Sequence, residues 1–444
     1  MKISFVVDKK GITAELLGDK YRLVYPAEIW KGFRQKEIFL DNTAYLLTVN
    51  MPMVSNFRAL EYNTSLPLFK PFFDKLILGG IPGAVDAYRA NTKKTIKKFL
   101  SIRYSFKNSR IKMPEKARIK TNNRAVVGFS CGKDSLLSLG VCNELGLDPV
   151  MTYINDTVSP GENTLKLRFT RRIARKFGLD HVIVRNEMEK LNDFETWGTP
   201  ETCLGYSHML ASFCLISLPI AQHFSANSIV LGCEQEFNHR FKNKDGIMTY
   251  PSFDQTSESV KGHSAMIQCL SNNKIGVSSV IEPLCDMAIL KILYHRYPEL
   301  AKFQVTCGEL DASKEPRWCH ECYDCTDTFI TLMALGINPK KVGFHKNLLK
   351  KKYKKYYLIF GGKKLPRHCI TKDERDGELL FLYLAHKSGF RGYLIDLFRK
   401  KFLEETKKRE DELLKKELKI TEPVTMPAKL KRQVMSIYKE ELNR

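Results

Sequence analysis

Short apolar runs alternate with longer amphipathic segments between Arg124 and Gly232, and this alternation constrains the fold more than any other feature of the sequence. Strands are predicted at residues 125–129, 150–154, 181–184 and 228–231, and helices at 136–144, 165–177 and 206–224. Strands and helices in alternation form a parallel sheet with helices on both faces, because each parallel connection must cross back over the sheet. We therefore predict an α/β fold with a doubly wound parallel sheet that binds ligands at the carboxyl ends of its strands.

Two regions of different character flank this alternation. The first 120 residues predict an N-terminal α+β accessory region, with strands at 3–7, 21–24 and 44–49, a helix near 84–100 and a basic linker at 103–123. Residues 341–444 predict a basic helical extension, with helices at 378–387 and 392–416. We therefore expect three units, comprising residues 1–120, 121–340 and 341–444.

The chain is strongly basic, with a formal net charge of +23. Residues 340–444 hold 29 Lys and Arg against 14 Asp and Glu, so a net +15 lies in the last quarter of the chain. Such an excess favours polyanionic partners, namely RNA, phosphorylated small molecules or an anionic membrane surface. The sequence has neither an apolar run of about 20 residues nor a signal-like start, so we expect a cytoplasmic protein that does not enter membranes.

A candidate phosphate-binding loop lies where the first strand of the alternation turns into the first helix. It reads Phe129-Ser130-Cys131-Gly132-Lys133-Asp134-Ser135. The free backbone N–H groups and the dipole of a helix start attract anions, and small residues let phosphate approach the backbone. Lys133 would add a positive charge, and Ser130 and Ser135 would donate hydroxyl hydrogen bonds. The alternative is an ordinary helix cap with a surface lysine.

The loop resembles the Ser-Gly-Gly-Lys-Asp-Ser motif of the PP-loop ATP pyrophosphatases, with Cys131 where that family usually has glycine. The family includes GMP and NAD synthetases, tRNA thiolases and 7-cyano-7-deazaguanine synthase. Its members cleave ATP between the α and β phosphates and transfer AMP to a carbonyl or carboxylate oxygen. The resemblance implies ATP and Mg²⁺ as cofactors, and it implies nucleotide binding by Ser130, Cys131, Gly132, Lys133, Asp134, Ser135, Asn155 and Gly232. The alternatives are a plain turn at Asn155 and Asp156 and a strand-end bend at Gly232.

A second motif is a cysteine cluster with the spacing C-x11-C-x2-C-x2-C, formed by Cys307, Cys319, Cys322 and Cys325. Four thiolates favour a tetrahedral Zn²⁺ ion with a structural role, and His320 is a spare candidate ligand. An iron–sulfur cluster or free thiols are the alternatives. Six further cysteines have no metal spacing and are expected to be small buried hydrophobes: Cys142, Cys203, Cys214, Cys269, Cys285 and Cys369.

Together, the loop, the Pro283-Leu284 pair after the apolar run 277–281 and the cysteine cluster resemble 7-cyano-7-deazaguanine synthase over residues 124–338. The Trp318-Cys319 pair and the apolar helix at 329–335 are similar to the UDP-muramoyl-L-alanyl-L-glutamate epimerase branch. A compact deazaguanine synthase has no counterpart of residues 1–120, so the resemblance does not imply a simple orthologue.

The segment after the strand at 228–231 is rich in polar side chains and is expected to overhang the site. Glu234, Asn238 and His239 are predicted to face the substrate or Mg²⁺, with a solvated loop as the alternative. The helix start is expected to lower the pKa of the Cys131 thiol. His208 and His223, on an apolar helix, are expected to be satisfied core residues.

These features predict an enzyme that forms AMP and pyrophosphate while adenylating a carboxylate or carbonyl of a small molecule, with Lys133, Asp134 and Glu234 as catalytic residues. The alternatives are a tRNA-modifying enzyme that binds RNA through its basic C-terminal region, a carboxylate-activating epimerase of a nucleotide-linked peptide, and a nucleotide-binding module without catalysis. A homo-oligomer is among the expected assemblies.

Overall fold

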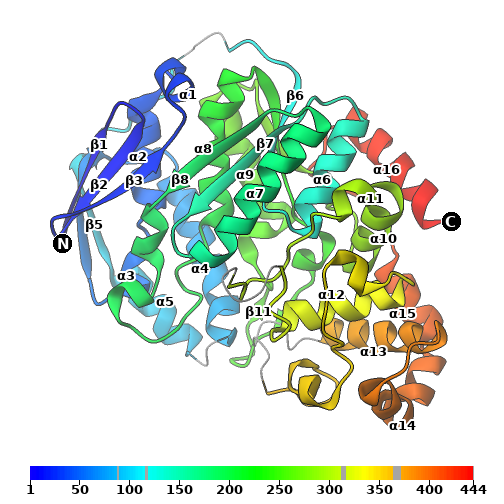
Figure 1. Cartoon of the computed structure of the whole chain (residues 1–444). Helices are drawn as coiled ribbons and strands as arrows, with labels where there is room; N and C mark the ends of the chain where they lie inside the picture. The colour runs from blue at the N-terminus through cyan, green and yellow to red at the C-terminus, as the bar shows by residue number, and fades with distance from the viewer. Residues whose placement is uncertain (88–89, 116–118, 312–316, 364–371, 444) are drawn as a thin grey trace.

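A ten-stranded sheet runs through the computed structural model, which describes residues 1–87, 90–115, 119–311, 317–363 and 372–443 (Figure 1). The strand order is β12-β9-β6-β7-β8-β3-β2-β1-β4-β5. The first five of these strands are β12 (Gly276–Ser279), β9 (Ala226–Leu231), β6 (Asn122–Gly128), β7 (Val150–Asp156) and β8 (His181–Asn186). The others are β3 (Asp19–Val24), β2 (Gly11–Leu16), β1 (Lys2–Val7), β4 (Ala59–Ser65) and β5 (Arg103–Asn108).

The five strands from β12 to β8 are parallel to one another, as the alternating pattern predicts. Side chains alternate between the two faces of this half of the sheet. Val126 and Ile229 enter one core, and Ala125, Val127 and Val230 enter another. Burial on both faces explains why these strands are continuous apolar runs and not alternating ones.

Helices cover both faces of the parallel half. The connections β6–β7 and β7–β8 run through α6 (Lys133–Glu144) and α7 (Pro160–Phe177), and those from β8 to β9 and β9 to β12 run through α8 (Met209–His223) and α9 (Ser257–Leu270). The chain thus leaves β6 toward β7 on one side and returns as β9 on the other. The strand order therefore reverses between β6 and β9. At such a topological switch point, ligands bind outside the carboxyl ends of the two strands.

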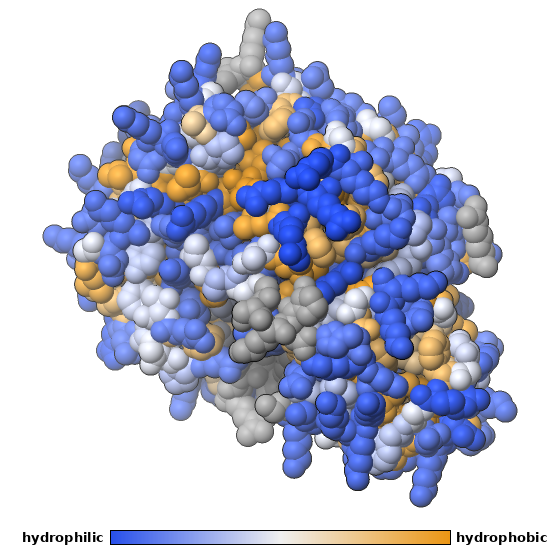
Figure 2. Space-filling model, in the orientation of Figure 1, coloured by the Kyte–Doolittle hydropathy of each residue, from blue (hydrophilic) through white to orange (hydrophobic). Residues whose placement is uncertain are grey.

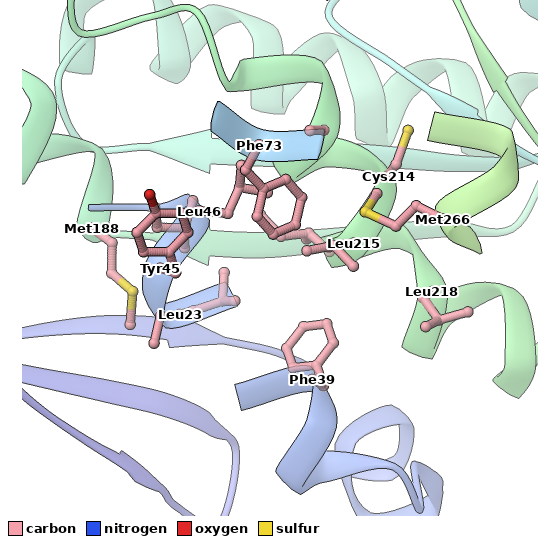
Figure 3. Close-up of a cluster of buried hydrophobic side chains, with 14 of the residues drawn as sticks. Leu23, Phe39, Tyr45, Leu46, Phe73, Met188, Cys214, Leu215, Leu218 and Met266 are labelled. Carbon is pink, nitrogen blue, oxygen red and sulfur yellow. The ribbon is translucent and has the colours of Figure 1, made fainter. Parts of the chain in front are cut away.

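The N-terminal region extends this same sheet. β3 pairs antiparallel with β8, with Leu23 opposite Asn186 and Val24 opposite Arg185. The two parts also share one core, in which Phe39, Tyr45 and Phe73 of the N-terminal region pack with Leu215 and Met266 of α8 and α9 (Figure 3). The sheet and the core therefore cross the boundary that the sequence places near residue 120.

Three N-terminal predictions differ from the structure. Residues 44–49 are not a strand, since α2 spans Lys36–Leu46 and the chain continues through a turn to the short helix α3 (Met51–Val54). The predicted linker at 103–123 begins as the edge strand β5, whose half-buried Tyr104 and Phe106 alternate with exposed neighbours. The helix expected near 84–100 is two helices, α4 (Lys70–Ala87) and α5 (Thr92–Ser101), and residues 88–89 lie outside the described chain.

The C-terminal extension is helical, as predicted, and it packs back onto the central sheet. Its helices are α13 (Lys372–Lys387), α14 (Tyr393–Lys408), α15 (Glu410–Glu417) and α16 (Ala428–Leu442). The Glu282 carboxylate accepts hydrogen bonds from the backbone N–H groups of Val424 and Thr425. The Tyr438 hydroxyl of α16 donates to the carbonyl of Val280. Among the described residues, no helix combines the length and apolarity needed to cross a membrane.

Candidate functional site

The predicted phosphate loop forms a tight turn at the sheet's switch point. Beyond β6, the Ser130 N–H donates to Ser135 Oγ (3.2 Å) and the Gly132 N–H donates to Ser130 Oγ (3.3 Å). Helix α6 starts at Lys133, so the N–H groups of its first turn lack partners within the helix, as at every helix start. The loop thus brings two hydroxyls and a helix N-terminus to one place, an arrangement that favours anion binding.

Cys131 adopts the left-handed backbone conformation that its position in the turn requires, with φ of 62°. Its side chain is fully buried and faces Lys166 and Thr170 of α7, away from the helix start. Burial raises the pKa of the Cys131 thiol to about 12. The expected lowering of this pKa is therefore wrong, because the desolvation of the thiolate outweighs any attraction by the helix dipole.

Three carboxylates surround the Lys133 ammonium. Its Nζ lies 2.9 Å from Asp134 Oδ1, 3.0 Å from Glu234 Oε2 and 2.6 Å from Asp286 Oδ1. Burial acts to lower the pKa of Lys133, but the charges of Asp134, Asp286 and Glu234 outweigh it and raise this pKa well above its usual range. The structure thus brings together Lys133, Asp134 and Glu234, the predicted catalytic residues. It adds Asp286, which was not predicted from the sequence.

Gly232 explains how Glu234 reaches Lys133. It follows β9 directly, and a Cβ atom at this position would lie 2.9 Å from the Cβ of Asp134. Only glycine lets the chain after β9 lie this close to the first turn of α6. A contact of Gly232 with nucleotide stays a prediction.

The end of β7 has a different local role. The Asp156 carboxylate accepts hydrogen bonds from the N–H groups of Val158 and Ser159, so it shapes the turn that leads into α7. Asn155 is half-buried opposite Arg185 of β8. Nucleotide binding by Asn155 stays a prediction.

Three carboxylates, those of Glu234, Glu236 and Asp286, each place one oxygen within 4.8 Å of the others. Glu236 belongs to the short turn η3 (Gln235–Asn238), and its Oε1 accepts the N–H of Asp286 at the start of α10 (Asp286–Arg296). Burial is the main cause that raises the pKa values of Glu234 and Glu236 well above their usual range, and the Asp286 charge adds to it. Burial also opposes ionisation of Asp286, yet the Lys133 charge lowers its pKa.

The C-terminal extension adds further acids to this region. Burial, reinforced by the charge of Asp286, raises the pKa of Glu374 on α13 to about 7 and that of Glu417 on α15 to about 8. Asp327 on α12 (Tyr323–Ala334) has its pKa raised by the same two causes. The site is therefore an acidic cluster to which both the central sheet region and the extension contribute.

The other polar residues predicted after β9 make structural contacts. Asn238 Oδ1 accepts the N–H of Ser257 at the start of α9 (2.8 Å), and His239 Nδ1 lies 3.2 Å from Asp373 of α13. Their approach to a substrate stays a prediction. His208 is a buried, hydrogen-bonded core residue, as predicted, whereas His223 is exposed because it lies at the end of α8.

A cavity of about 400 Å³ lies beside η3. Small residues of α4, the aromatic rings of Tyr206, Phe237 and Phe253, and the polar Asp254 and Gln255 line it. Phe237, whose side chain lines this cavity, directly follows Glu236 of the carboxylate cluster in the chain. The cavity is the right size to bury a small organic ligand.

The four predicted metal ligands come together around one point. Cys307 Sγ lies 3.9 Å from Cys322 Sγ, and Cys319 Sγ lies 3.8 Å from Cys325 Sγ. Four sulfurs bound at about 2.3 Å to a tetrahedral zinc ion are about 3.8 Å apart. The cluster therefore fits a single Zn²⁺ ion, whereas an iron–sulfur cluster places several irons between its thiolates and needs a wider arrangement.

His320 is outside this ligand set, since its ring packs edge-on against Phe344. The remaining cysteines follow the prediction in part: Cys142, Cys214 and Cys285 are buried, and Cys203 is half-buried. Cys269 is exposed on α9, against the prediction, and Cys369 lies outside the described residues.

The cysteine cluster is hydrogen-bonded to the predicted phosphate loop through the segment that precedes Cys307. The backbone N–H of Val305, two residues before Cys307, donates to the carbonyl of Cys131 (2.8 Å). Arg317, two residues before Cys319, donates from Nε to the carbonyl of Gln304 (2.7 Å). A metal at the cysteines would thus fix the segment that supports the loop.

No protein-family model matches this chain, and no curated protein matches it in sequence.

Proposed function

We propose that this protein binds a nucleoside triphosphate, with ATP as the expected nucleotide, and transfers AMP to an oxygen of a small carboxylate. The observation that carries the proposal is the loop Ser130–Ser135 at the switch point between β6 and β9, with Lys133 held beside Glu234 and Asp286. Polyphosphates bind to helix starts at such switch points. The resemblance of the loop to the PP-loop motif supports the same chemistry.

In the proposed reaction, a carboxylate oxygen of the substrate attacks the α phosphorus. The bond between this phosphorus and the oxygen bridging to the β phosphorus breaks, and pyrophosphate leaves with the electron pair. The first-turn N–H groups of α6, the hydroxyls of Ser130 and Ser135, and the Lys133 ammonium stabilise the negative charge that develops on the leaving group. Mg²⁺ would offset the phosphate charge when the nucleotide is bound.

The acyl-adenylate that results is reactive toward a nitrogen nucleophile or toward rearrangement of the substrate. The 400 Å³ cavity beside η3 is the proposed place for the carboxylate-bearing molecule. Its lining combines aromatic faces with hydrogen-bonding groups, which suits a planar polar compound. Glu234 would hold the Lys133 ammonium at the start of α6 before the nucleotide binds.

The test is product analysis with zinc-loaded protein, ATP, Mg²⁺ and fractions of a metabolite extract. We expect AMP and pyrophosphate in amounts that depend on one fraction. Lys133→Ala should lower AMP formation by about 10²-fold or more, the usual effect of losing a preorganised transition-state donor. Glu234→Gln should lower turnover more than nucleotide affinity.

The matched control is Lys97→Ala, which removes an exposed lysine of α5 and should leave AMP formation unchanged. ADP and phosphate as products, or full activity of Lys133→Ala, would contradict the proposal. An absence of any nucleotide cleavage would favour a binding module instead.

A tRNA-modifying enzyme is the second candidate, and α7 is the observation that favours it. This helix starts beside the site, after β7, and exposes Arg168, Arg171, Arg172 and Arg175. Figure 2 shows a strongly hydrophilic patch near the centre of the face where α7 lies in Figure 1. A row of arginines suits the phosphate backbone of RNA. Dependence of AMP formation on added tRNA, and not on a small-molecule fraction, would select this candidate.

A further inference from the structure

When its carboxylates are ionised, the acidic cluster carries more negative charge than its one ammonium can neutralise. Lys133 pairs with Asp134, Glu234 and Asp286, and Glu236 is hydrogen-bonded to the backbone of Asp286. Three carboxylates thus share one ammonium, with a fourth next to them, in a region where Glu234 and Lys133 are 7% and 8% exposed. Buried charges need a partner of opposite sign, so this arrangement calls for an additional cation.

The carboxylates of Glu234, Glu236 and Asp286 are spaced as the ligands of one metal ion would be. One oxygen of each lies within 4.8 Å of the others. A hard divalent cation binds carboxylate oxygens at about 2.0–2.6 Å, so ligand oxygens on opposite sides of one ion are separated by about 4–5 Å. One ion can therefore reach all three without a rearrangement of the backbone.

Glu417 provides an independent sign of a missing ligand. It lies on α15, which packs against α10, and its side chain is buried, with the residue 5% exposed. Among the described residues, nothing donates a hydrogen bond to its Oε2. The neighbouring Lys416 is held by Asp373 at 2.6 Å and does not turn to this oxygen. A buried carboxylate oxygen without a donor beside three clustered carboxylates indicates a cation or a cation-bound water.

We propose that Glu234, Glu236 and Asp286 bind one hard divalent cation, Mg²⁺ or Mn²⁺, before any nucleotide is present, and that Glu417 holds a water of this ion. The ligands are all oxygens, which excludes the thiolate-preferring ions that suit the cysteine cluster. The cation takes over the neutralisation of Glu234 and Asp286. Lys133 is then released toward the loop, a consequence that rests on the proposed function.

The test is a Mn²⁺ titration followed by electron paramagnetic resonance, with protein that holds zinc but no other metal and no nucleotide. We expect one bound Mn²⁺ per chain, which Mg²⁺ displaces. Glu236→Gln and Asp286→Asn should each weaken binding at least about tenfold, since each removes a charged ligand. Glu299→Gln, a change of an exposed carboxylate on α11 (Pro298–Ala301), should leave binding unchanged.

Unaltered Mn²⁺ binding in both cluster variants, or no binding by the wild type without nucleotide, would overturn the proposal. Thermal unfolding separates a ligand role from a structural one. If the cluster is a cation site, Glu236→Gln relieves repulsion, so its Tm without Mg²⁺ equals or exceeds that of the wild type and no longer rises with Mg²⁺. A lower Tm with a preserved response to Mg²⁺ would make Glu236 structural and reject the site.

The two proposals fail separately. Nucleotide-independent Mn²⁺ binding without AMP formation would preserve the cation site and reject the proposed reaction. AMP formation without such Mn²⁺ binding would support the proposed reaction and reject the cation site.

Discussion

At the scale of residues, the chemistry of the site depends on which charged side chains are buried next to one another. Lys133 and Glu234 are separated by 101 positions in the chain, and they meet because Gly232 allows the close approach of two segments. Cys131 shows the opposite case, where a residue beside a helix start points its side chain into the core. The direction of a side chain, and not its place in the motif, decides its chemistry.

The buried imidazole of His263 should make the stability of the protein depend on pH. His263 of α9 is fully buried, its Nε2 contacts the carbonyl of Asp254, and burial lowers its pKa to about 4. Its folded-state pKa lies below the unfolded value of about 6.5. The unfolded chain therefore binds the proton first as the pH falls, so stability is intact above pH 6.5 and is lost toward pH 4.

Between pH 7.5 and 5, this residue alone should cost about 2 kcal/mol of the free energy of unfolding. Urea unfolding of the wild type and His263→Gln at both pH values measures the effect. The variant should lose about 2 kcal/mol less than the wild type over this range. Equal losses in the two proteins would show that His263 is protonated in the folded state.

At the scale of elements, the cysteine cluster acts on the phosphate loop through the segment 303–307. The bond from Val305 to Cys131 makes the loop depend on the conformation of this segment. We expect that removal of zinc, or Cys319→Ser, increases hydrogen exchange in residues 129–135 and 303–307. Strands β4 and β5 are the internal control, because they lie at the far end of the sheet from the loop. Unchanged exchange in the loop would show that the two sites are independent.

Elements built from local signals could be predicted from the sequence, and pairings across long separations could not. The strand, turn and helix around Ser130 are encoded within about 20 residues, and so is the spacing of the three clustered cysteines. Asp286 was missed because its partner Lys133 is 153 positions away and nothing near Asp286 marks it as an ion-pair residue. Residues 44–49 were misread because helix α2 is buried on nearly all sides, and such a helix has the same apolar composition as a strand.

At the scale of the whole molecule, continuous packing joins regions that the sequence suggests are separate. The sheet connects residues 1–120 to the central strands through β3 and β8, and α16 packs against α10. The division into 1–120, 121–340 and 341–444 stays a prediction, and it has a direct thermodynamic test. Because the core is shared, we expect one cooperative unfolding transition for the zinc-loaded chain.

Tyr438→Ala in α16 should lower the free energy of that whole transition by about 3–5 kcal/mol, since it empties a fully buried aromatic position. Tyr393→Ala, at a position that is 43% exposed, should change it by less than about 0.5 kcal/mol. If calorimetry instead showed separate unfolding transitions, and only one of them responded to Tyr438→Ala, the chain would consist of independently folding units.

The pairing of β3 with β8 also has a consequence for synthesis on the ribosome. β3 ends at Val24, and its partner β8 begins only at His181, so the N-terminal strands emerge long before their neighbour exists. During that interval the backbone edge of β3 is open to pairing with other nascent chains. Newly made protein should therefore depend on chaperones until about residue 190 has left the exit tunnel, and a slower ribosome would lengthen the exposure.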